Sequence, residues 1–324
     1  MEAERDAPSI SVVMATAGRP QLLRQTLDSI VRSEFDRSRL QVVVVDNLDD
    51  ERTRAVCAAL GVALPLTYVV ESEQGKNAAL NRGLEACVGE LIAFIDDDVV
   101  VEQNWLAELA RGSLRWPSHH VFGGRVLPRF PEPCPAHLAE SRYQSVMFTT
   151  LDRGEAEGPD PRFLPFGPNM AIRRGVFVEG WRYDPSIGPK MGASYIMGSE
   201  TELLRRLRDG GYKAVYLPRC VVHHQIRPEQ LKTIWMLKRG VRYGKSVAFR
   251  SPTPRRRWFG APPRLYRRIV VNSARSIGAM ITGKRSLAFD NAMDVAIALG
   301  EIAHHRNARD VREQIGRPGT DPER

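Results

Sequence analysis

The sequence has few cysteines and no long hydrophobic run, and both absences narrow the classes of protein it can encode. Cys57, Cys87, Cys134 and Cys220 are its four cysteines, and no two of them form a C-x-x-C pair. This argues against a zinc ribbon and against a disulfide framework. No apolar stretch approaches the ~20 residues that a membrane-spanning helix needs. The first residues, MEAERDAPS, are too acidic and polar for a secretory signal. We therefore expect a cytoplasmic protein.

Basic residues outnumber acidic ones, which indicates an anionic partner. The 324 residues include 47 Lys and Arg against 38 Asp and Glu, a net charge of +9. Residues 251–324 hold 14 basic and 7 acidic side chains, so most of the excess lies there. A nucleotide, a phospholipid surface or a nucleic acid would each suit this charge. No nucleic-acid-binding motif is present, and we expect no nucleic acid as a partner.

Apolar strands alternate with amphipathic helices in the first third of the chain. The predicted strands are 10–15, 40–45, 66–72 and 91–95, and the predicted helices are 21–33, 51–61 and 75–88. This alternation predicts an α/β fold with a parallel sheet covered by helices on both faces. In such sheets the ligand binds beyond the carboxyl ends of the strands. Thr16, Asp46 and residues 96–98 follow three of these strands.

The rest of the chain changes character twice. Residues 112–200 are rich in Gly and Pro and predict short strands and loops with one or two helices. A helix from Ser199 to Gly210 then leads into a strand that ends in two histidines. Further on, residues 228–250 predict an amphipathic helix and residues 264–285 a second, basic one. The apolar face predicted for the first of these consists of Leu231, Ile234, Trp235 and Val241.

Three adjacent aspartates, Asp96, Asp97 and Asp98, directly follow the predicted strand 91–95. Neighbouring carboxylates repel each other and resist burial. A divalent cation would relieve the repulsion, and Mg²⁺ or Mn²⁺ commonly bridges carboxylates to substrate phosphates. The triplet therefore predicts an Mg²⁺ or Mn²⁺ site. The alternative is a solvated acidic turn that caps a helix at 102–111.

Six segments, in this order, resemble those of glycosyltransferase family 2, whose members have the GT-A fold. The resemblance covers about residues 8–250, and the segments are VVMATAGRPQLLRQTLDSI, VVVVDN, GKNAALNRGL, FIDDDV, FGPNMAIRR and GSETELLRRLRDGGYKAVYLPRCVVHH. It implies a Rossmann-like, mostly parallel sheet flanked by helices, followed by a basic helical extension. It also implies a metal-dependent, inverting transferase that moves a sugar from a nucleotide-diphosphate sugar to a hydroxyl acceptor.

The resemblance assigns roles to individual residues. Nucleotide-sugar contacts fall on Ala15, Thr16, Arg19, Asp46, Lys76, Asp96, Asp97 and Asn169, with Gly167 and Pro168 beside the sugar. The metal ligands are Asp96, Asp98 and His223, with His224 as a further candidate. Each has a simpler alternative: Thr16 and Asp46 could cap turns, Lys76 could be a solvated lysine, and paired histidines at a strand end are often packing residues.

The catalytic base is where the sequence departs from the family pattern. Inverting transfer needs a carboxylate to accept the proton of the attacking hydroxyl. The family usually has Glu-Asp at this point, whereas this chain has Ser199 and Glu200. We assign Glu200 as the base and Glu202 as a residue that could support it. Alternatively, Ser199 and Glu202 form a capping box without catalytic work.

The resemblance also divides the chain. Residues 1–228 correspond to the catalytic domain, with a nucleotide-sugar half at 8–111 and an acceptor half at 112–228. Residues 229–315 form the basic helical extension, and 316–324 are expected to be disordered. The extension, with Arg255, Arg256, Arg257, Arg264, Arg267 and Arg268 near Trp258 and Tyr266, could lie on the inner face of an anionic membrane. A solvated helical cap and an oligomer interface are the alternatives.

Two further features limit the function. Processive synthases resembling this family carry a Q-x-x-R-W motif, whereas here RRRW is preceded by Pro254, so we expect single-sugar transfer. A UDP-sugar is the expected donor, with GDP and dTDP left open. The acceptor is of unknown type and could belong to polysaccharide, glycolipid or glycosylated natural-product synthesis. The alternative function is a non-catalytic sugar-nucleotide or membrane-binding homologue.

Overall fold

The computed structural model describes residues 7–190, 195–252, 254 and 256–315. The tail predicted to be disordered, 316–324, and Arg255 of the basic cluster lie outside these residues. The chain forms two compact units, described separately below. The first consists of Met1–Pro131 and Phe148–Ile226, and the second of Glu132–Met147 and Arg227–Arg324.

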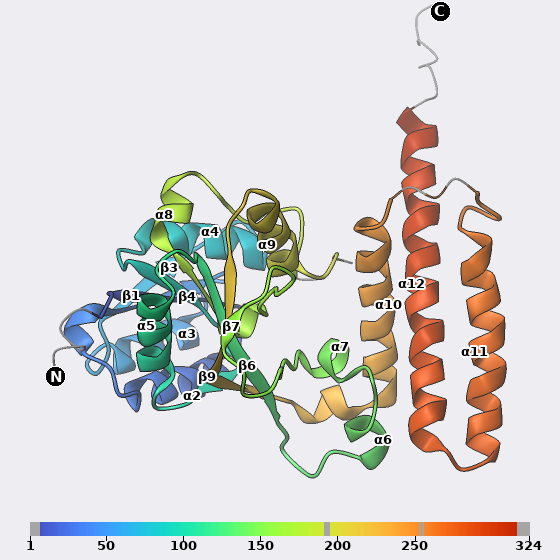
Figure 1. Cartoon of the computed structure of the whole chain (residues 1–324), viewed down its shortest axis with the longest axis horizontal. Coiled ribbons are helices and arrows are strands. Elements are labelled where there is room, and N and C mark those ends of the chain that lie inside the picture. The colour runs from blue at the N-terminus through green and yellow to red at the C-terminus, as the bar shows by residue number, and fades with distance from the viewer. Residues whose placement is uncertain (1–6, 191–194, 253, 255, 316–324) are drawn as a thin grey trace, which may run out of the picture. The chain divides into compact units, whose positions relative to one another are not determined.

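The first unit begins with the predicted alternation of strands and helices (Figure 1). The elements are β1 (Ile10–Thr16), α2 (Pro20–Val31), η1 (Arg37–Arg39), β2 (Leu40–Asp46), α3 (Glu51–Leu60), β3 (Leu66–Val70), α4 (Lys76–Ala86), β4 (Leu91–Phe94), β5 (Val99–Val101) and α5 (Trp105–Arg115). Pro20 starts α2 because proline lacks the N–H that a first helical residue would leave unpaired.

The remaining strands of the first unit come from the Gly- and Pro-rich middle of the chain and from the strand predicted after it. One strand of the middle is nine residues long, although only short strands are predicted there. The elements follow in chain order. They are β6 (Val121–Arg129), β7 (Gly158–Pro159), η2 (Gly167–Asn169), β8 (Met170–Arg173), α8 (Arg174–Val178), α9 (Ser199–Asp209) and β9 (Ala214–Gln225), while α7 (Gln144–Phe148) spans the boundary between the units.

All described strands of the first unit form one sheet, in the order β3-β2-β1-β4-β8-β6-β9-β5, with β7 beside β9. The strands β1 to β4, β6 and β9 run in one direction, and β5, β7 and β8 run against them. The prediction of a mostly parallel sheet flanked by helices is confirmed, and this is the α/β class that the sequence predicts.

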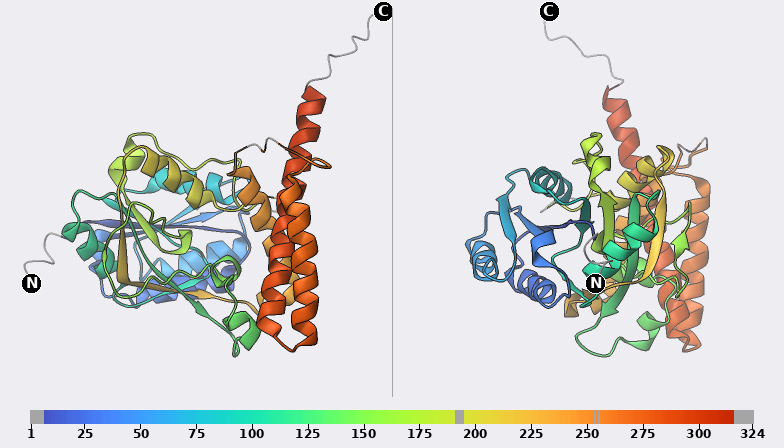
Figure 2. Two further views of the ribbon diagram at one scale, coloured as in Figure 1. Left: turned by 45° about the vertical axis from the view of Figure 1, so that its right-hand side comes forward. Right: turned by 60° about the vertical axis from the view of Figure 1, so that its left-hand side comes forward.

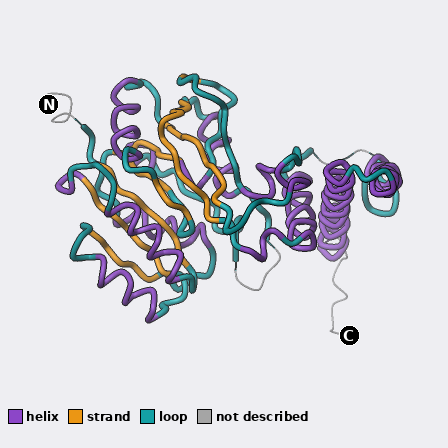
Figure 3. The backbone as a smooth tube through the Cα atoms, turned by 90° about the horizontal axis from the view of Figure 1, so that it is seen from below, coloured by secondary structure: helices purple, strands orange, loops and turns teal. Residues whose placement is uncertain are grey.

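Helices cover both faces of this sheet (Figures 2 and 3). Side chains alternate along a strand, so Val12 of β1 faces one apolar cluster and its neighbour Val13 faces the other. The first cluster includes residues of α2, α3 and α5, and the second includes residues of α4, α8 and α9. Burial on both faces explains why these strands are continuously apolar.

The second unit contains α6 (Ala136–Ala139), η3 (Pro228–Leu231), α10 (Thr233–Phe249), α11 (Pro263–Ile281) and α12 (Arg285–Ile315). Its three long helices lie side by side, with α12 in the middle (Figures 1 and 3). The predicted apolar face of α10 is wrong at Ile234, which is 61% exposed, whereas Leu231, Trp235 and Val241 are partly buried. The helix instead buries Met236, Gly240, Gly244 and Ala248. Glycine allows close approach: a Cβ on Gly244 would lie 2.0 Å from the carbonyl oxygen of Ile297 on α12.

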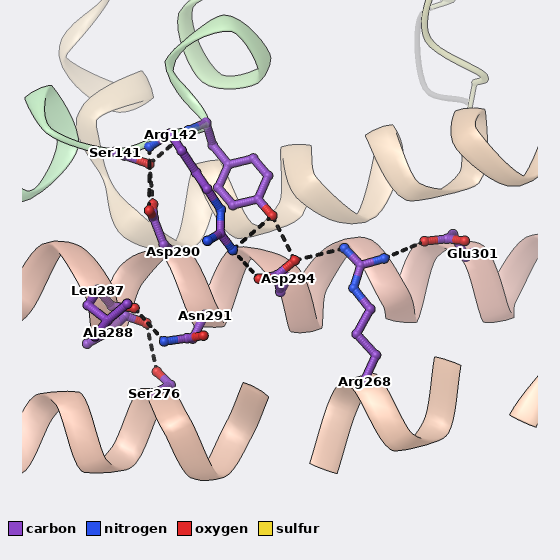
Figure 4. A network of polar contacts seen from close by, with 11 residues as sticks. Ser141, Arg142, Arg268, Ser276, Leu287, Ala288, Asp290, Asn291, Asp294 and Glu301 are labelled. Carbon is purple, nitrogen blue, oxygen red and sulfur yellow. Dashed lines mark hydrogen bonds and ion pairs between the residues drawn. The ribbon is translucent and has the colours of Figure 1, made fainter. Parts of the chain in front are cut away.

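A polar network on Asp294 joins the segment around Arg142 to the helices of the second unit (Figure 4). The carboxylate of Asp294 accepts hydrogen bonds from the Tyr143 hydroxyl at 2.8 Å and from Arg268 of α11 at 2.9 Å, and it pairs with Arg142. Arg268 also contacts Glu301 at 2.9 Å. In the described part of the chain, no helix is both long and apolar enough to cross a membrane.

Gly124 allows β6 to pack closely against β9, the strand that carries the two histidines. A Cβ at this position would lie 1.9 Å from the carbonyl oxygen of Cys220, where the register between the two strands shifts. We expect Gly124→Ala to lower the free energy of unfolding by about 2 kcal/mol or more, or roughly 5 °C in melting temperature.

The matched control is Gly175→Ala. A Cβ on Gly175, in α8, would meet nothing within 4 Å, so this variant should melt at or above the wild-type temperature. Equal melting temperatures for both variants would contradict the packing argument for Gly124.

Candidate active site

Polar side chains gather where β1, β2 and β4 end. Thr16 and Asp46 are register partners at the carboxyl ends of β1 and β2. The aspartates at 96–98 follow β4, which pairs with β1 on its other side. Ala15 is partly exposed beside Thr16. The parallel sheet therefore brings together residues that lie more than 80 positions apart in the sequence, at the edge where such folds bind ligands.

Asp97 and Asp98 are buried and are paired with Arg19, which lies directly before α2. Asp97 is fully buried and Asp98 is 6% exposed. Arg19 forms ion pairs with both, at 2.9 Å to Asp98. The Thr16 hydroxyl donates to the Asp97 carboxylate at 2.6 Å. The alternative in which the triplet caps a helix does not hold, because β5 intervenes and α5 begins only at Trp105.

Burial dominates the electrostatics of the triplet. It raises the pKa of Asp97 to about 7, opposed by the charge of Arg19, and the charges of Asp98 and Asp96 raise it further. For Arg19, burial lowers the pKa, but Asp97, Asp98 and Asp96 together raise it above its ordinary value. The cluster thus favours a cation strongly, and Arg19 supplies that cation in the protein alone.

Asp96 faces a second cation, Lys76, in a small pocket. Lys76 is the first residue of α4, and its ammonium pairs with the Asp96 carboxylate. Burial lowers the pKa of Lys76, but Asp96, Glu200 and Asp98 raise it above its usual value. The pocket is lined by Lys76, Leu80, Phe94, Ile95, Asp96, Gly167, Met170, Tyr183, Ser199 and Glu200. The predicted base, Glu200, therefore shares this pocket with Lys76 and Asp96, two of the residues predicted to contact the nucleotide sugar.

Glu200 enters this pocket from the first turn of α9. Gly198 caps the helix in a left-handed conformation with φ 92°, and no side chain caps it. The capping-box alternative is therefore wrong, and the Ser199 hydroxyl donates instead to the Glu200 carboxylate at 3.1 Å. The Glu202 carboxylate accepts two hydrogen bonds from the Arg206 guanidinium, at 2.5 and 2.8 Å. Glu200 remains the acid of this helix that lines the pocket.

The two histidines of β9 point to opposite faces, because adjacent residues of a strand alternate. His224 Nε2 lies 3.5 Å from the Asp98 carboxylate, and its Nδ1 lies 2.6 Å from the Phe148 carbonyl oxygen. His223 Nε2 instead lies 3.2 Å from the Glu102 carboxylate. The structure thus brings His224, and not His223, to the aspartate triplet.

The environment of His224 suits a metal ligand. Because a carbonyl oxygen can only accept, Nδ1 carries the proton and donates it to Phe148. In the neutral ring this leaves the Nε2 lone pair facing Asp98, which is the usual arrangement of ligating histidines. Burial lowers the pKa of His224, while its contact with Asp98 raises it above the ordinary value.

A divalent cation fits this donor set only with ligands from outside the chain. Among the described residues, no group of three or more His, Cys, Asp or Glu side chains is arranged to hold a metal. Asp98 and His224 supply two converging donors. Mg²⁺ and Mn²⁺ accept such carboxylate sites when substrate phosphates and water complete the coordination. The residues therefore fit a cation that is bound together with a diphosphate.

Two residues predicted to contact the nucleotide sugar instead form hydrogen bonds within the protein. The Asn169 amide is fully buried, accepts from Trp105 at 2.9 Å, and donates to the carbonyl groups of Arg125 and Cys220. The Asp46 carboxylate accepts from the Leu48 and Asp50 amides and from the Tyr68 hydroxyl. Asp46 thus caps the turn after β2, which is the simpler alternative to a nucleotide contact. Asn169 joins β6, β9 and α5.

Tyr68 and Tyr183 belong to the site region but have no motif in the sequence. Tyr68 donates to Asp46 at 2.8 Å from β3, and it could have been suspected as a polar tip on a strand beside Asp46. Tyr183 lies in an irregular segment after α8, where the sequence offers no periodic pattern that would place it in the pocket.

Comparison with known proteins assigns the family. The glycosyl transferase family 2 model matches residues 11–181, more than half of the chain. The chain is 25% identical over 240 residues to the glucosyl-dolichyl phosphate glucuronosyltransferase of Haloferax volcanii, covering 73% of this chain and 75% of that protein. It is 25% identical over 241 residues to the succinoglycan biosynthesis protein ExoM of Rhizobium meliloti, covering 73% of each.

Solved structures share the fold. The mannosyltransferase PcManGT from Pyrobaculum calidifontis, in complex with GDP-Man and Mn²⁺, matches with a TM-score of 0.59 and 19% identity, over 91% of this chain and 87% of that one. TarS 1-349 of S. aureus matches with a TM-score of 0.51 and 14% identity, over 97% and 94%. With the sheet described above, these matches identify a GT-A fold. The chain is a transferase that belongs to glycosyltransferase family 2.

Proposed function

We propose that this chain is a metal-dependent, inverting glycosyltransferase that moves one sugar from a nucleotide-diphosphate sugar to a hydroxyl acceptor. One observation carries the proposal: the triplet at 96–98, Lys76 and Glu200 converge at the carboxyl edge of the sheet. Such a site can hold an anionic donor beside a carboxylate base. We further propose that 1–228 contains the catalytic domain and that 229–315 is the extension, with Glu132–Met147 belonging to the same compact unit as the extension.

On the donor side, Arg19 and Lys76 are the cations that a diphosphate would attract. Thr16 and Ala15 flank the nucleotide at the end of β1, and Asp96 and Asp97 face the ribose or sugar. Asp98 and His224 would hold Mg²⁺ or Mn²⁺, which when bound offsets the charge that develops on the departing diphosphate. We transfer the role predicted for His223 to His224, because of its distance to Asp98.

Glu200 acts as the general base. Its carboxylate accepts the proton of the acceptor hydroxyl while that oxygen attacks the anomeric carbon. The sugar–phosphate bond breaks on the opposite face, and the nucleoside diphosphate leaves with the bonding electrons. The Ser199 hydroxyl, which donates to Glu200 at 3.1 Å, orients the carboxylate. Inversion at the anomeric carbon follows from this single displacement.

The names of similar proteins suggest which substrates to test. PcManGT was solved with GDP-Man, and TarS 1-349 was solved with UDP-GlcNAc. The Haloferax protein acts on a glucosyl-dolichyl phosphate, and ExoM serves succinoglycan biosynthesis. We propose a UDP-sugar as donor and a lipid-linked or polysaccharide acceptor, with a GDP-sugar as the first alternative donor to test.

The proposal is tested with UDP-, GDP-, dTDP- and CDP-sugars, each with and without Mn²⁺ or Mg²⁺. We expect one nucleotide class to raise the melting temperature in a metal-dependent manner and to release its nucleoside diphosphate. Asp98→Ala should lose both effects, while Asp209→Ala, at an exposed position of α9, should keep them. A shift without release would indicate the non-catalytic homologue. No shift with any donor would contradict the transferase proposal.

The neighbouring histidines offer a matched pair of variants for the metal site. We expect His224→Ala to raise the Mn²⁺ concentration needed for half-maximal sugar transfer by tenfold or more, because a ligand is lost. His223→Ala, whose ring contacts Glu102 instead, should change it by less than twofold. Equal effects of the two substitutions would contradict the assignment of His224.

The base is tested with Glu200→Gln, which keeps the shape of the side chain but cannot accept the proton. The kcat for transfer should fall about 10²- to 10⁴-fold, while the donor-induced thermal shift stays unchanged. Glu202→Gln serves as the control and should retain transfer, since Glu202 pairs with Arg206. A Glu200→Gln enzyme with near wild-type kcat would show that another group takes the proton.

The outer face of α11 suits an anionic membrane surface. This helix contains Arg264, Arg267, Arg268 and Arg275 and no acidic residue. Val270, Ile277 and Ile281 are 69%, 56% and 81% exposed, and they recur at helical spacing. An exposed apolar stripe among arginines is typical of interfacial helices. We therefore propose peripheral attachment to the inner face of the membrane, which also suits a lipid-linked acceptor.

Vesicle co-sedimentation tests this attachment. The wild type should bind vesicles of phosphatidylcholine with phosphatidylglycerol, and binding should fall at least tenfold with phosphatidylcholine alone and in Ile277→Ser/Ile281→Ser. The control Val178→Ser removes a side chain in α8 that is 71% exposed, and it should bind as the wild type does. Vesicle binding that is equal in all proteins would contradict the proposal, as would a dimer that only the α11 variant loses.

A further inference from the structure

Tyr183 carries a buried hydroxyl that has no hydrogen-bond partner among the described residues. The side chain is 2% exposed, and none of residues 7–190, 195–252, 254 and 256–315 bonds its oxygen. Leaving a buried polar group unpaired costs free energy, which phenylalanine at the same position would avoid. An unpaired hydroxyl in a pocket therefore raises the question of what it binds there.

The position of Tyr183 is fixed from two sides. The Asn81 amide on α4 accepts from the Tyr183 backbone N–H at 3.0 Å and donates to its carbonyl oxygen at 2.9 Å. The neighbouring Asn77 donates to the Asp184 carbonyl at 2.7 Å. The Tyr183 ring packs edge-on against Phe94 of β4, with centroids 5.6 Å apart. The backbone and the ring of Tyr183 thus hold the hydroxyl in place, without any hydrogen bond from the hydroxyl itself.

Tyr183 lines the charged pocket together with Lys76, Asp96 and Glu200. Burial raises the pKa of Tyr183 well above its usual value, and the charges of Glu200 and Asp96 add to this, so the hydroxyl stays protonated. Asp96 already pairs with Lys76, and Glu200 accepts from Ser199. A neutral group that can donate and accept therefore lies in the wall of the pocket where the proposed function places the substrate.

We propose that the Tyr183 hydroxyl forms a hydrogen bond with a hydroxyl group of the donor sugar, and that this contact selects the sugar. The inference rests on the proposed function. The donor side is favoured over the acceptor because the ring packs on Phe94, the last residue of β4, two positions before the first aspartate of the triplet. A site with a buried polar group discriminates against sugars that lack its partner, because that group is then left unpaired.

Tyr183→Phe tests the inference, with the donor identified by the panel above. The kcat/KM for that donor should fall roughly 10- to 100-fold, while the melting temperature without ligand stays equal or rises. The matched control is Tyr216→Phe, because the Tyr216 hydroxyl is also buried but bonds the backbone at Arg153 and Gly154. This control should melt at a lower temperature and keep its kcat/KM.

Deoxy-sugar donors identify the contact. With one deoxy donor, wild type and Tyr183→Phe should have equal kcat/KM, because that sugar lacks the hydroxyl that bonds Tyr183. With donors that lack a different hydroxyl, the kcat/KM of Tyr183→Phe should remain below that of the wild type. If Tyr183→Phe matches the wild type with the natural donor, the inference is overturned and the proposed function stands. If the wild type itself releases no nucleoside diphosphate from any donor, both are overturned.

Discussion

The candidate site depends on three neighbouring carboxylates at the end of a buried strand. Asp97 and Asp98 have almost no contact with solvent, and their charges would repel each other strongly without cations nearby. The fold supplies these from separate parts of the chain, Arg19 before α2 and Lys76 at the start of α4, and it places His224 of β9 against Asp98. The acid cluster can therefore form only when these three elements have packed correctly.

The ion pairs of Arg19 and Lys76 with the carboxylates suit an exchange in which the two cations take a bound diphosphate as their partner. Arg19 and Lys76 are partly exposed, with 38% and 23% of their side chains accessible. In the proposed function, the diphosphate of a donor attracts both, and the carboxylates they leave become available to a divalent cation. Asp98 and His224 stay together at the same edge, and Glu200 approaches from α9. Cation binding and donor binding should consequently depend on each other.

The sequence predicts the first third of the fold well and the second unit less well. Buried strands such as β2 are continuously apolar, so the sequence predicts where they lie and, for β2, that the strand ends at Asp46. The apolar face of α10 is not, because its packing on α12 relies on Gly240 and Gly244, which carry no hydrophobic signal. The choice between His223 and His224 depends on the register of β9 with β5, and the place of Tyr183 depends on loop geometry. Neither is set by local sequence.

The most direct test of this account is a calorimetric titration of Mn²⁺ into the wild-type protein, with and without saturating nucleoside diphosphate from the donor class that the panel identifies. We expect weak Mn²⁺ binding to the protein alone, because Arg19 and Lys76 hold the carboxylates, and binding at least tenfold tighter with the nucleotide present. Equal Mn²⁺ affinity under both conditions would contradict a cation site that the donor completes.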